Sequence, residues 1–334
     1  MKALHLVYEK ETAPSTRIRL VQMAPHLERR GYRCRLSAYP RSAGARRDFA
    51  ARVDAGHLVV LHRARPTRRE AAWWRALPAR LVYDFDDAVM VGRRRGLRGA
   101  IARRRRAAGF ARALACADAA SCGNAFLASH CGALPHAIVP SAVALEVPRH
   151  VPRDPATPFR VGWVGRASNL RYVRAIAPAL ATLAERMPLV LICVSEEPLA
   201  LRGCPVENVT WSRDAEAAHV AGFDVGIMPL GPDDAWSRGK CAYKLLQYMA
   251  AGVPALGSDV GMNRELIRPG VNGCLAADLG DWERALAALA ADAGLRARLG
   301  AAGRDTAQAY GYAAVADRLA ALLDAVSAGS AAAR

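Results

Sequence analysis

Short apolar runs alternate with helix-length amphipathic stretches along almost the whole chain. In the first half the apolar runs predict five strands, and the stretches between them predict helices. The predicted strands are Ala3–Tyr8, Cys34–Tyr39, His57–Leu61, Leu81–Phe85 and His136–Val139, and the predicted helices are Arg17–Arg30, Ala45–Val53, Arg68–Ala76 and Arg98–Ala115. Strands that alternate with helices indicate βαβ units and a mostly parallel sheet.

The alternation restarts after Val147–Pro158, a segment with four prolines and no periodicity that we interpret as a linker. Beyond it the predicted strands are Phe159–Val164, Leu189–Val194, Asn208–Trp211, Asp224–Met228 and Pro254–Ser258, and the predicted helices are Asn169–Arg186, Asp214–Ala221, Lys240–Ala251, Arg264–Arg268 and the alanine-rich stretch Trp282–Val326. The sequence thus predicts two doubly wound, Rossmann-like α/β domains, 1–150 and 151–310, followed by a closing helix and tail, 311–334. Because such folds bind ligands at the carboxyl ends of their strands, we expect the site in the cleft between the two domains.

Composition restricts the class of protein. With 334 residues, 52% of them hydrophobic, the chain is too apolar to be disordered and long enough for about two domains. No apolar run is long enough to predict a membrane-spanning helix. Eight cysteines are scattered without a CxxC pair, so we expect reduced thiols in a cytoplasmic protein and neither a disulfide framework nor a zinc site.

The charge balance predicts an anionic partner. The formal net charge is +17, and all but four of the 47 basic residues are arginine. Such a charge attracts nucleotides, acidic membrane surfaces or nucleic acids, although most of the arginines are expected to be ordinary solvated surface.

A glycine-arginine pair follows the first strand of the second half. Gly165 and Arg166 end the apolar run VGWV, and Arg171 comes five positions later at the start of a predicted helix. Glycine lets a phosphate approach the backbone, and guanidinium groups bind phosphate through two hydrogen bonds. The alternative is an ordinary strand-to-helix turn with two surface arginines.

Two further motifs follow predicted strands. Lys240, Lys244 and Gln247 have helical spacing, which places them on one face near the helix N-terminus, although a solvated polar face explains such spacing equally well. The next segment, GSDVGMNRELI, contains Gly261, Asn263 and Glu265. There we expect backbone amides to face a ligand and Glu265 to accept hydrogen bonds from sugar or ribose hydroxyls. A surface carboxylate is the alternative for Glu265.

Together these motifs resemble the C-terminal half of family 4-type, group 1 nucleotide-sugar glycosyltransferases with the GT-B fold. The resemblance covers roughly 159–276, with a looser match at 310–323 to the closing helix that packs back on the first domain. It implies that Arg166 and Arg171 grip the donor diphosphate. The resemblance also implies two glutamates, the first in contact with the transferred sugar and the second with the nucleotide ribose. They fall at Gly239 and Gln247 here, so this chain departs from the pattern at both places.

The N-terminal half resembles the same enzymes more faintly. Candidate acceptor-side residues follow its strands: Arg17, Arg19, His62, Asp84 and Asp86. Ordinary helix capping and a structural histidine are the alternatives for the first three. Asp84-Phe-Asp86 alone would suggest a divalent metal. It lies outside the donor motifs, however, and the resemblance implies no essential metal, so we expect a structural or hydroxyl-orienting role.

The region Arg93–Arg106 contains a dense basic cluster. It would suit an anionic membrane surface, whereas a solvated charge run is the common alternative, and the scarcity of nearby aromatic residues disfavours nucleic acid.

The sequence therefore predicts a cytoplasmic glycosyltransferase at or near the inner face of a membrane. It would move a sugar from an NDP-sugar, needing no other cofactor, to a glycan, lipid-linked or envelope acceptor, with retention of configuration. We expect Arg166 and Lys244 to stabilise the diphosphate leaving group. A non-catalytic relic of the fold and a basic nucleic-acid-binding protein are the alternatives.

Overall fold

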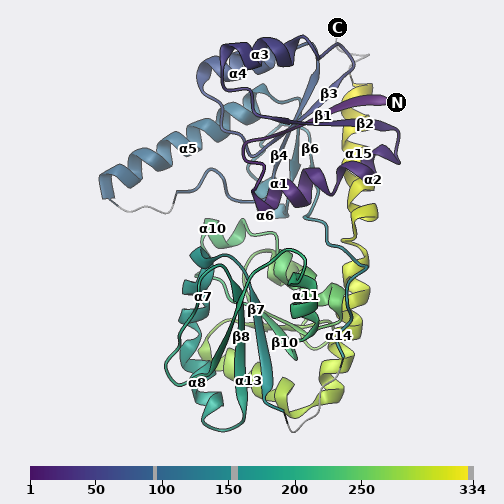
Figure 1. The fold of residues 1–334 in the computed structure, drawn as a ribbon. Helices are drawn as coiled ribbons and strands as arrows, with labels where there is room; N and C mark the ends of the chain where they lie inside the picture. Colours follow the sequence, from purple (N-terminus) through teal and green to yellow (C-terminus); the bar gives the residue numbers. More distant parts are fainter. Residues whose placement is uncertain (93–95, 152–156, 330–334) are drawn as a thin grey trace. The chain divides into compact units, whose positions relative to one another are not determined.

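The computed structural model of the chain describes residues 1–92, 96–151 and 157–329, and these fall into two compact units (Figure 1). The first unit comprises Met1–Ala142, Gly239–Cys241 and Tyr312–Arg334, and the second comprises Val143–Arg238 and Ala242–Gly311. Part of the predicted linker, the first three arginines of the basic cluster and the end of the tail lie outside the described residues.

The first unit is built on a six-stranded sheet in the order β2-β1-β3-β4-β5-β6. Each pair of neighbouring strands in it is parallel. Its strands are β1 (Lys2–Tyr8), β2 (Tyr32–Ala38), β3 (Leu58–His62), β4 (Arg80–Phe85), β5 (Ala119–Cys122) and β6 (His136–Ile138). The sequence prediction missed β5, which consists of small residues with low strand propensity.

Most helices of the first unit agree with the predicted positions, but the predicted helix Arg17–Arg30 is divided. The helical elements are α1 (Pro14–Thr16), the π-helical turn η1 (Arg17–Val21), α2 (Ala24–Glu28), α3 (Ala43–Ala50), α4 (Arg68–Arg75), α5 (Gly96–Cys116), α6 (Ala125–Ala128) and α15 (Tyr312–Ala328). A continuous helix is prevented in part by Pro25, because proline lacks the N–H that would continue the hydrogen-bond ladder.

Helix α15 completes the core of the first unit although it comes from the far end of the chain. Val315, Leu319 and Leu323 are buried in the same hydrophobic cluster as Leu4 and Leu6 of β1. At the end of this helix the Asp324 carboxylate accepts a hydrogen bond from Tyr32 Oη at 2.6 Å and pairs with Lys2 at 2.9 Å. The first unit is therefore assembled from both ends of the sequence.

The second unit has a second parallel sheet, in the order β12-β11-β10-β7-β8-β9. Its strands are β7 (Phe159–Val164), β8 (Leu189–Ser195), β9 (Val206–Thr210), β10 (Val225–Met228), β11 (Ala255–Ser258) and β12 (Cys274–Ala276). Only the three-residue β12 was not predicted. Two parallel sheets covered by helices confirm the predicted α/β class with two Rossmann-like domains.

The helices of the second unit include two corrections to the sequence prediction. They are η2 (Ala167–Asn169, a 3₁₀ turn), α7 (Leu170–Ala175), α8 (Ala177–Ala184), α9 (Glu216–Ala221), α10 (Ala235–Arg238), α11 (Tyr243–Ala251), α12 (Met262–Leu266), α13 (Leu279–Ala291) and α14 (Ala293–Gln308). The prediction that Lys240 begins a helix is wrong: Ala242, with φ +48°, adopts the left-handed conformation, so α11 begins at Tyr243. The alanine-rich stretch is likewise interrupted, and Asp292 caps the start of α14 through a hydrogen bond to the Leu295 N–H.

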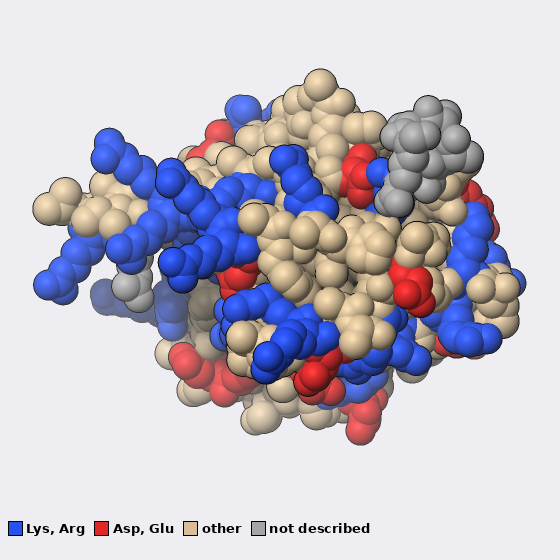
Figure 2. All heavy atoms as spheres, turned by 90° about the horizontal axis from the view of Figure 1, so that it is seen from above, with Lys and Arg blue, Asp and Glu red and all other residues tan. Residues whose placement is uncertain are grey.

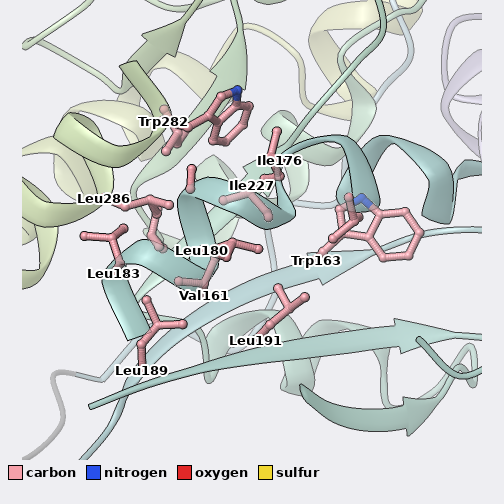
Figure 3. Close-up of a cluster of buried hydrophobic side chains, with 14 of the residues drawn as sticks. Val161, Trp163, Ile176, Leu180, Leu183, Leu189, Leu191, Ile227, Trp282 and Leu286 are labelled. Carbon is pink, nitrogen blue, oxygen red and sulfur yellow. The ribbon is translucent and has the colours of Figure 1, made fainter. Parts of the chain in front are cut away.

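A hydrophobic cluster fills the space between the second sheet and its helices (Figure 3). Trp163 of β7, Leu191 of β8 and Ile227 of β10 come from the sheet, while Leu180 of α8 and Leu286 of α13 come from the helices. Burial of such side chains contributes roughly 1.5–3 kcal/mol each and holds the strand ends in fixed positions.

All eight cysteines are free thiols. None of the helices in the described ranges combines the length and apolar character needed to cross a bilayer.

We predict that Gly162→Ala destabilises the second unit by about 2–3 kcal/mol. A β-carbon at position 162 would lie 1.9 Å from Cγ of the buried Phe223 ring, so the core would have to rearrange. Gly44→Ala in α3, where the nearest atom would be 4.0 Å away, is the matched control and should leave stability unchanged or slightly raised. Thermal unfolding followed by circular dichroism measures both, and equal midpoints would contradict the packing described above.

Candidate functional site

Gly165 and Lys244, both predicted to bind the donor, are in contact at the end of β7. A β-carbon on Gly165 would lie 2.8 Å from Cε of Lys244 and 2.8 Å from Cζ2 of Trp163. The Lys244 ammonium lies 5.8 Å from the centroid of the Trp163 ring. The absence of a side chain at position 165 thus lets the lysine of α11 pass over the strand end. This arrangement brings a positive charge to the loop that begins with Gly165.

Arg166 occupies the same loop and pairs with a residue that sequence reasoning missed. Its Nε lies 3.4 Å from Oε1 of Glu196, which follows β8, and Oε2 of Glu196 accepts a 2.9 Å hydrogen bond from the Ala167 N–H. Both side chains are substantially exposed. A carboxylate therefore occupies a position of the kind that a phosphate would take, between a guanidinium group and a backbone N–H.

Arg171 lies at the start of α7 and has a different partner. Its guanidinium carbon is 4.3 Å from the centroid of the Tyr172 ring, and its Nη2 donates a hydrogen bond to the Tyr172 hydroxyl. Arg171 is exposed. Stacking on an aromatic ring restricts the guanidinium group without neutralising its charge, so the group remains available to an anion.

Gln247 is held by a carboxylate from a neighbouring helix. Its Nε2 donates a 2.8 Å hydrogen bond to Oε1 of Glu216 in α9. Gln247 stands where the family resemblance expects a glutamate, and the structure places a glutamate side chain directly beside it. Glu216 carries no motif of its own and lies 31 positions away in the sequence. The pairing was therefore not visible from the sequence.

The loop after β11 places three predicted residues in different environments. Gly261 has φ +53°, and a β-carbon there would lie 2.9 Å from Cα of Arg238, so both conformation and space require glycine. Asn263 is buried and donates to the Ser258 carbonyl at 3.1 Å, while its Oδ1 has no hydrogen-bond partner among the described residues. Glu265 is exposed on α12. Asn263 therefore supports the loop from inside, and Glu265 faces solvent.

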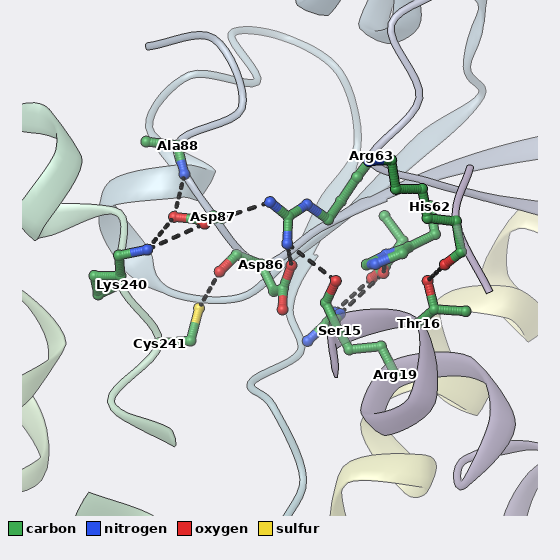
Figure 4. A network of polar contacts seen from close by, with 12 residues as sticks. Ser15, Thr16, Arg19, His62, Arg63, Asp86, Asp87, Ala88, Lys240 and Cys241 are labelled. Carbon is green, nitrogen blue, oxygen red and sulfur yellow. Dashed lines mark hydrogen bonds and ion pairs between the residues drawn. The ribbon is translucent and has the colours of Figure 1, made fainter. Parts of the chain in front are cut away.

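In the first unit, Asp84 is the centre of a buried polar network, of which Figure 4 labels Arg19 and His62. Arg19, on η1, donates to both of its oxygens, from Nε at 2.9 Å and from Nη2 at 2.5 Å. Nδ1 of His62 lies 2.7 Å from Oδ2, and the Ser121 hydroxyl donates to Oδ1 at 2.6 Å. A further guanidinium N–H of Arg19 donates to the Val139 carbonyl at 2.9 Å. The network joins the carboxyl ends of β3, β4 and β5 to the turn that follows β1.

The charge of Arg19 keeps Asp84 ionised. Burial alone would raise the pKa of this carboxyl, but the Arg19 charge and the hydrogen bonds from Arg19 and His62 outweigh it and hold the pKa far below its ordinary value. An ionised Asp84 can only accept a hydrogen bond, so Nδ1 of His62 is the donor in this contact and Nε2 is the remaining ring nitrogen. That atom is buried and has no partner among the described residues.

A second charged cluster lies beside this network and includes Lys240 (Figure 4). Asp87 accepts two 3.1 Å hydrogen bonds from the Lys240 ammonium and lies 3.4 Å from Nη2 of Arg63. Nη1 of Arg63 donates to Ser15 Oγ at 3.0 Å and to Asp86 Oδ1 at 3.3 Å. Arg63 has φ +55°, a conformation that is costly for arginine. Lys240 thus belongs to the first unit, whereas Lys244 belongs to the second.

The predicted residues therefore form separate groups. In the second unit Gly165, Arg166 and Lys244 lie around one strand end, and Gln247 is tied to Glu216. In the first unit Arg19, His62 and Asp84 form one network, and Asp86 lies in the adjacent cluster. Arg17, at the start of η1, is half-buried. Glu196 and Glu216 were missed, because their significance depends on partners that are distant in sequence.

Replacing Asp84 should destabilise the folded protein. We predict that Asp84→Asn lowers the free energy of unfolding by about 3–5 kcal/mol, because Arg19 would remain buried without its counter-charge. Glu207→Gln is the control: Glu207 pairs with Arg160 at a half-exposed position, and its loss should cost less than about 1 kcal/mol.

The pH dependence follows from the direction of the Asp84 shift. Because folding lowers the pKa, the stabilisation is complete above the unfolded pKa of about 3.9 and is lost as the pH falls further. The stability difference between the wild type and Asp84→Asn should therefore narrow below about pH 4. Urea unfolding across this range tests it, and a constant difference would contradict an ionised Asp84.

The chain is similar to known proteins in part of its sequence and in its fold. Residues 158–292 match the family model described as glycosyl transferases group 1. Among solved structures, a sucrose-phosphate synthase from Thermosynechococcus elongatus is 15% identical, with a TM-score of 0.71, covering 98% of this chain and 100% of that one. HepE from Anabaena, solved with UDP-glucose, is 14% identical, with a TM-score of 0.74, covering 97% of this chain and 100% of that one.

A third similar structure is the apo form of WaaB, a lipopolysaccharide outer core galactosyltransferase. It is 11% identical, with a TM-score of 0.67, and the match covers 97% of this chain and 99% of that one. No curated protein matches the chain by sequence. Part of the second unit thus matches the group 1 glycosyl transferase family model, and the likeness to these solved structures shows that the whole chain has a GT-B fold.

Proposed function

We propose that the protein transfers a sugar from a nucleoside diphosphate sugar to a glycan, lipid-linked or envelope acceptor. The observation that carries the proposal is the contact between Lys244 and Gly165 at the end of β7, with Arg166 next along the loop. HepE, a protein of similar fold, has been solved with UDP-glucose. A diphosphate bound at this loop would meet the Lys244 ammonium, the Arg166 guanidinium and backbone N–H groups.

These cations would act on the leaving group. Negative charge builds on the diphosphate as the glycosidic bond breaks, so positive groups fixed beside it lower the barrier. Arg166 is held by Glu196 in a half-exposed pair, which is worth little in water, and a diphosphate would compete for the guanidinium group. We further propose that transfer retains the anomeric configuration and requires no metal, as the family resemblance implies. Product stereochemistry by NMR and activity in the presence of a chelator test these two points.

Glu216 would supply the carboxylate that position 247 lacks. Gln247 holds Oε1 of Glu216 at 2.8 Å, so the glutamate is fixed beside the position where the resemblance expects a ribose contact. A carboxylate accepts hydrogen bonds from both hydroxyls of a ribose more strongly than a neutral amide does. We propose that the pair Gln247–Glu216 binds the nucleotide ribose.

Removing the two cations should abolish donor binding. We predict that Arg166→Ala with Lys244→Ala eliminates the thermal shift produced by the best ligand among UDP-, GDP-, CMP- and dTDP-sugars, because a ligand that binds only the folded protein raises its stability. Arg202→Ala with Arg298→Ala removes the same charge from exposed positions of the same unit and should leave the shift unchanged.

Other results would contradict the donor site or favour a different function. An unchanged nucleotide affinity in Arg166→Ala with Lys244→Ala would refute the site. Nucleotide binding without release of NDP, in the presence of candidate acceptors, would favour a non-catalytic relic. Tight duplex binding that falls steeply with salt and ignores Arg166 would favour a nucleic-acid-binding protein.

The ribose contact has its own test. We predict that Glu216→Ala weakens binding of the preferred ribonucleoside diphosphate by about tenfold and removes its advantage over the 2′-deoxy form, since a lost charged hydrogen bond is worth about 1.5–3 kcal/mol. Glu197→Ala, on an exposed residue after β8, is the control. Calorimetric titration measures both, and an undiminished preference for ribose in Glu216→Ala would refute the assignment.

We also propose that the protein acts at the cytoplasmic side of a membrane, where a lipid-linked acceptor would be held. The basic helix α5 supports the contact with a membrane.

A further inference from the structure

Helix α5 (Gly96–Cys116) extends beyond the body of the first unit (Figure 1). Its C-terminal half is anchored, since Phe110, Ala113 and Cys116 are buried there. Gly109 allows close contact at this end, because a β-carbon on it would lie 2.8 Å from Cβ of Arg65. The N-terminal half presents most of its side chains to solvent. A helix fixed at one end and exposed at the other is suited to contact something outside the unit.

The exposed half has an apolar stripe. Leu97 is 80% exposed and Ile101 is 45% exposed, which makes both of them exposed large hydrophobic residues of the same helix. The spacing of four places them on one face, and Arg104 and Ala108 continue that face at spacings of three and four. Exposed apolar side chains in a row on a surface helix indicate an interaction site, whereas scattered single ones do not.

Arginines flank this stripe. Arg98, Arg104 and Arg105 are exposed on the same side of the helix, and no acidic residue occurs between Gly96 and Cys116. Figure 2 shows Lys and Arg side chains gathered on the projecting part of the surface that α5 forms, with uncharged residues at its tip. Arg103 and Arg106 differ from the other three, because their side chains pack near Gly92. A β-carbon added to Gly92 would lie 2.8 Å from Cγ of Arg103 and 3.5 Å from Cδ of Arg106. The surface thus combines apolar side chains with concentrated positive charge.

This combination fits an anionic lipid bilayer. A helix that lies in the membrane interface buries apolar side chains at the level of the headgroups, while its basic residues meet anionic lipids. A nucleic acid would use the arginines but not Leu97 or Ile101. Phe110, the aromatic residue of α5, is buried and therefore not available to stack on bases.

We propose that one face of α5, the α5 stripe, lies on an anionic lipid surface and brings the enzyme to a membrane-held acceptor. This face is formed by Leu97, Arg98, Ile101, Arg104 and Arg105. The delivery of the enzyme to an acceptor rests on the proposed function, whereas the lipid contact itself does not. Both classes of side chain contribute: leucine and isoleucine enter the headgroup region, and the arginines attract the anionic leaflet.

Co-sedimentation of the full chain with vesicles tests the proposal. Wild-type protein should bind mixed phosphatidylcholine–phosphatidylglycerol vesicles and not pure phosphatidylcholine vesicles. Arg104→Glu with Arg105→Glu and, separately, Leu97→Ser with Ile101→Ser should each weaken partitioning by about tenfold or more. Raising the salt concentration should weaken the binding that remains in the serine variant and should have less effect on the glutamate variant. Arg68→Glu with Arg69→Glu on α4, an equal change of charge at exposed positions, should bind like the wild type.

Several results would overturn the lipid contact: no binding of the wild type to the mixed vesicles, an equal loss in the α4 control, or full binding by the serine variant. Duplex DNA binding that depends on Arg104 and Arg105 but not on Leu97 and Ile101, without vesicle binding, would assign the surface to nucleic acid instead. The α5 variants should keep the thermal shift with the donor nucleotide, and Arg166→Ala with Lys244→Ala should still bind vesicles. Failure of the α5 stripe and failure of the donor site are therefore distinguishable.

Discussion

The carboxylate of Asp84 is the constraint around which the first unit is organised. A buried ionised group must be surrounded by donors, and Asp84 obtains them from Arg19, His62 and Ser121. Arg19 comes from a π-helical turn, an uncommon element that is often found at functional sites. The same arginine also holds the Val139 carbonyl after β6. One charge pair thus determines where the ends of several parallel strands meet.

The second unit depends on close packing at strand ends. Gly162 leaves room for Phe223, Gly165 leaves room for Lys244, and Gly261 passes close to the backbone of Arg238. At each place a side chain would displace a neighbour that the fold requires. The pyrophosphate-binding role proposed for the β7 loop therefore uses space that the packing of the sheet already creates.

The fold was largely predictable from the sequence because a parallel α/β protein repeats one pattern many times. Ten of the strands in the described ranges appear as apolar runs, whereas β5 and β12 contain no β-branched residue and were not recognised. The ends of the helices were harder to predict from the sequence. The prediction for Lys240 failed because the left-handed conformation of Ala242 depends on its surroundings and carries no local signal.

For the donor site, sequence patterns identified both members of the contact between Gly165 and Lys244. For two other pairs they identified only one member: Arg166 and Gln247 were found, whereas their partners Glu196 and Glu216 come from other elements and lie in no recognisable motif. Arg63 and Asp87 acquire their meaning from contacts with Ser15 and Lys240, which no local pattern contains.

The route of the chain has a consequence for the order of assembly. The first unit needs Gly239–Cys241 and helix α15, and the second unit is complete by Gly311. During synthesis on a ribosome, the first unit must wait for α15, which is translated after the second unit, so the second unit can reach its native state earlier. Until then, the hydrophobic cluster that includes Leu4, Leu6 and the apolar residues of α15 stays incomplete, and a nascent chain is most vulnerable to aggregation there.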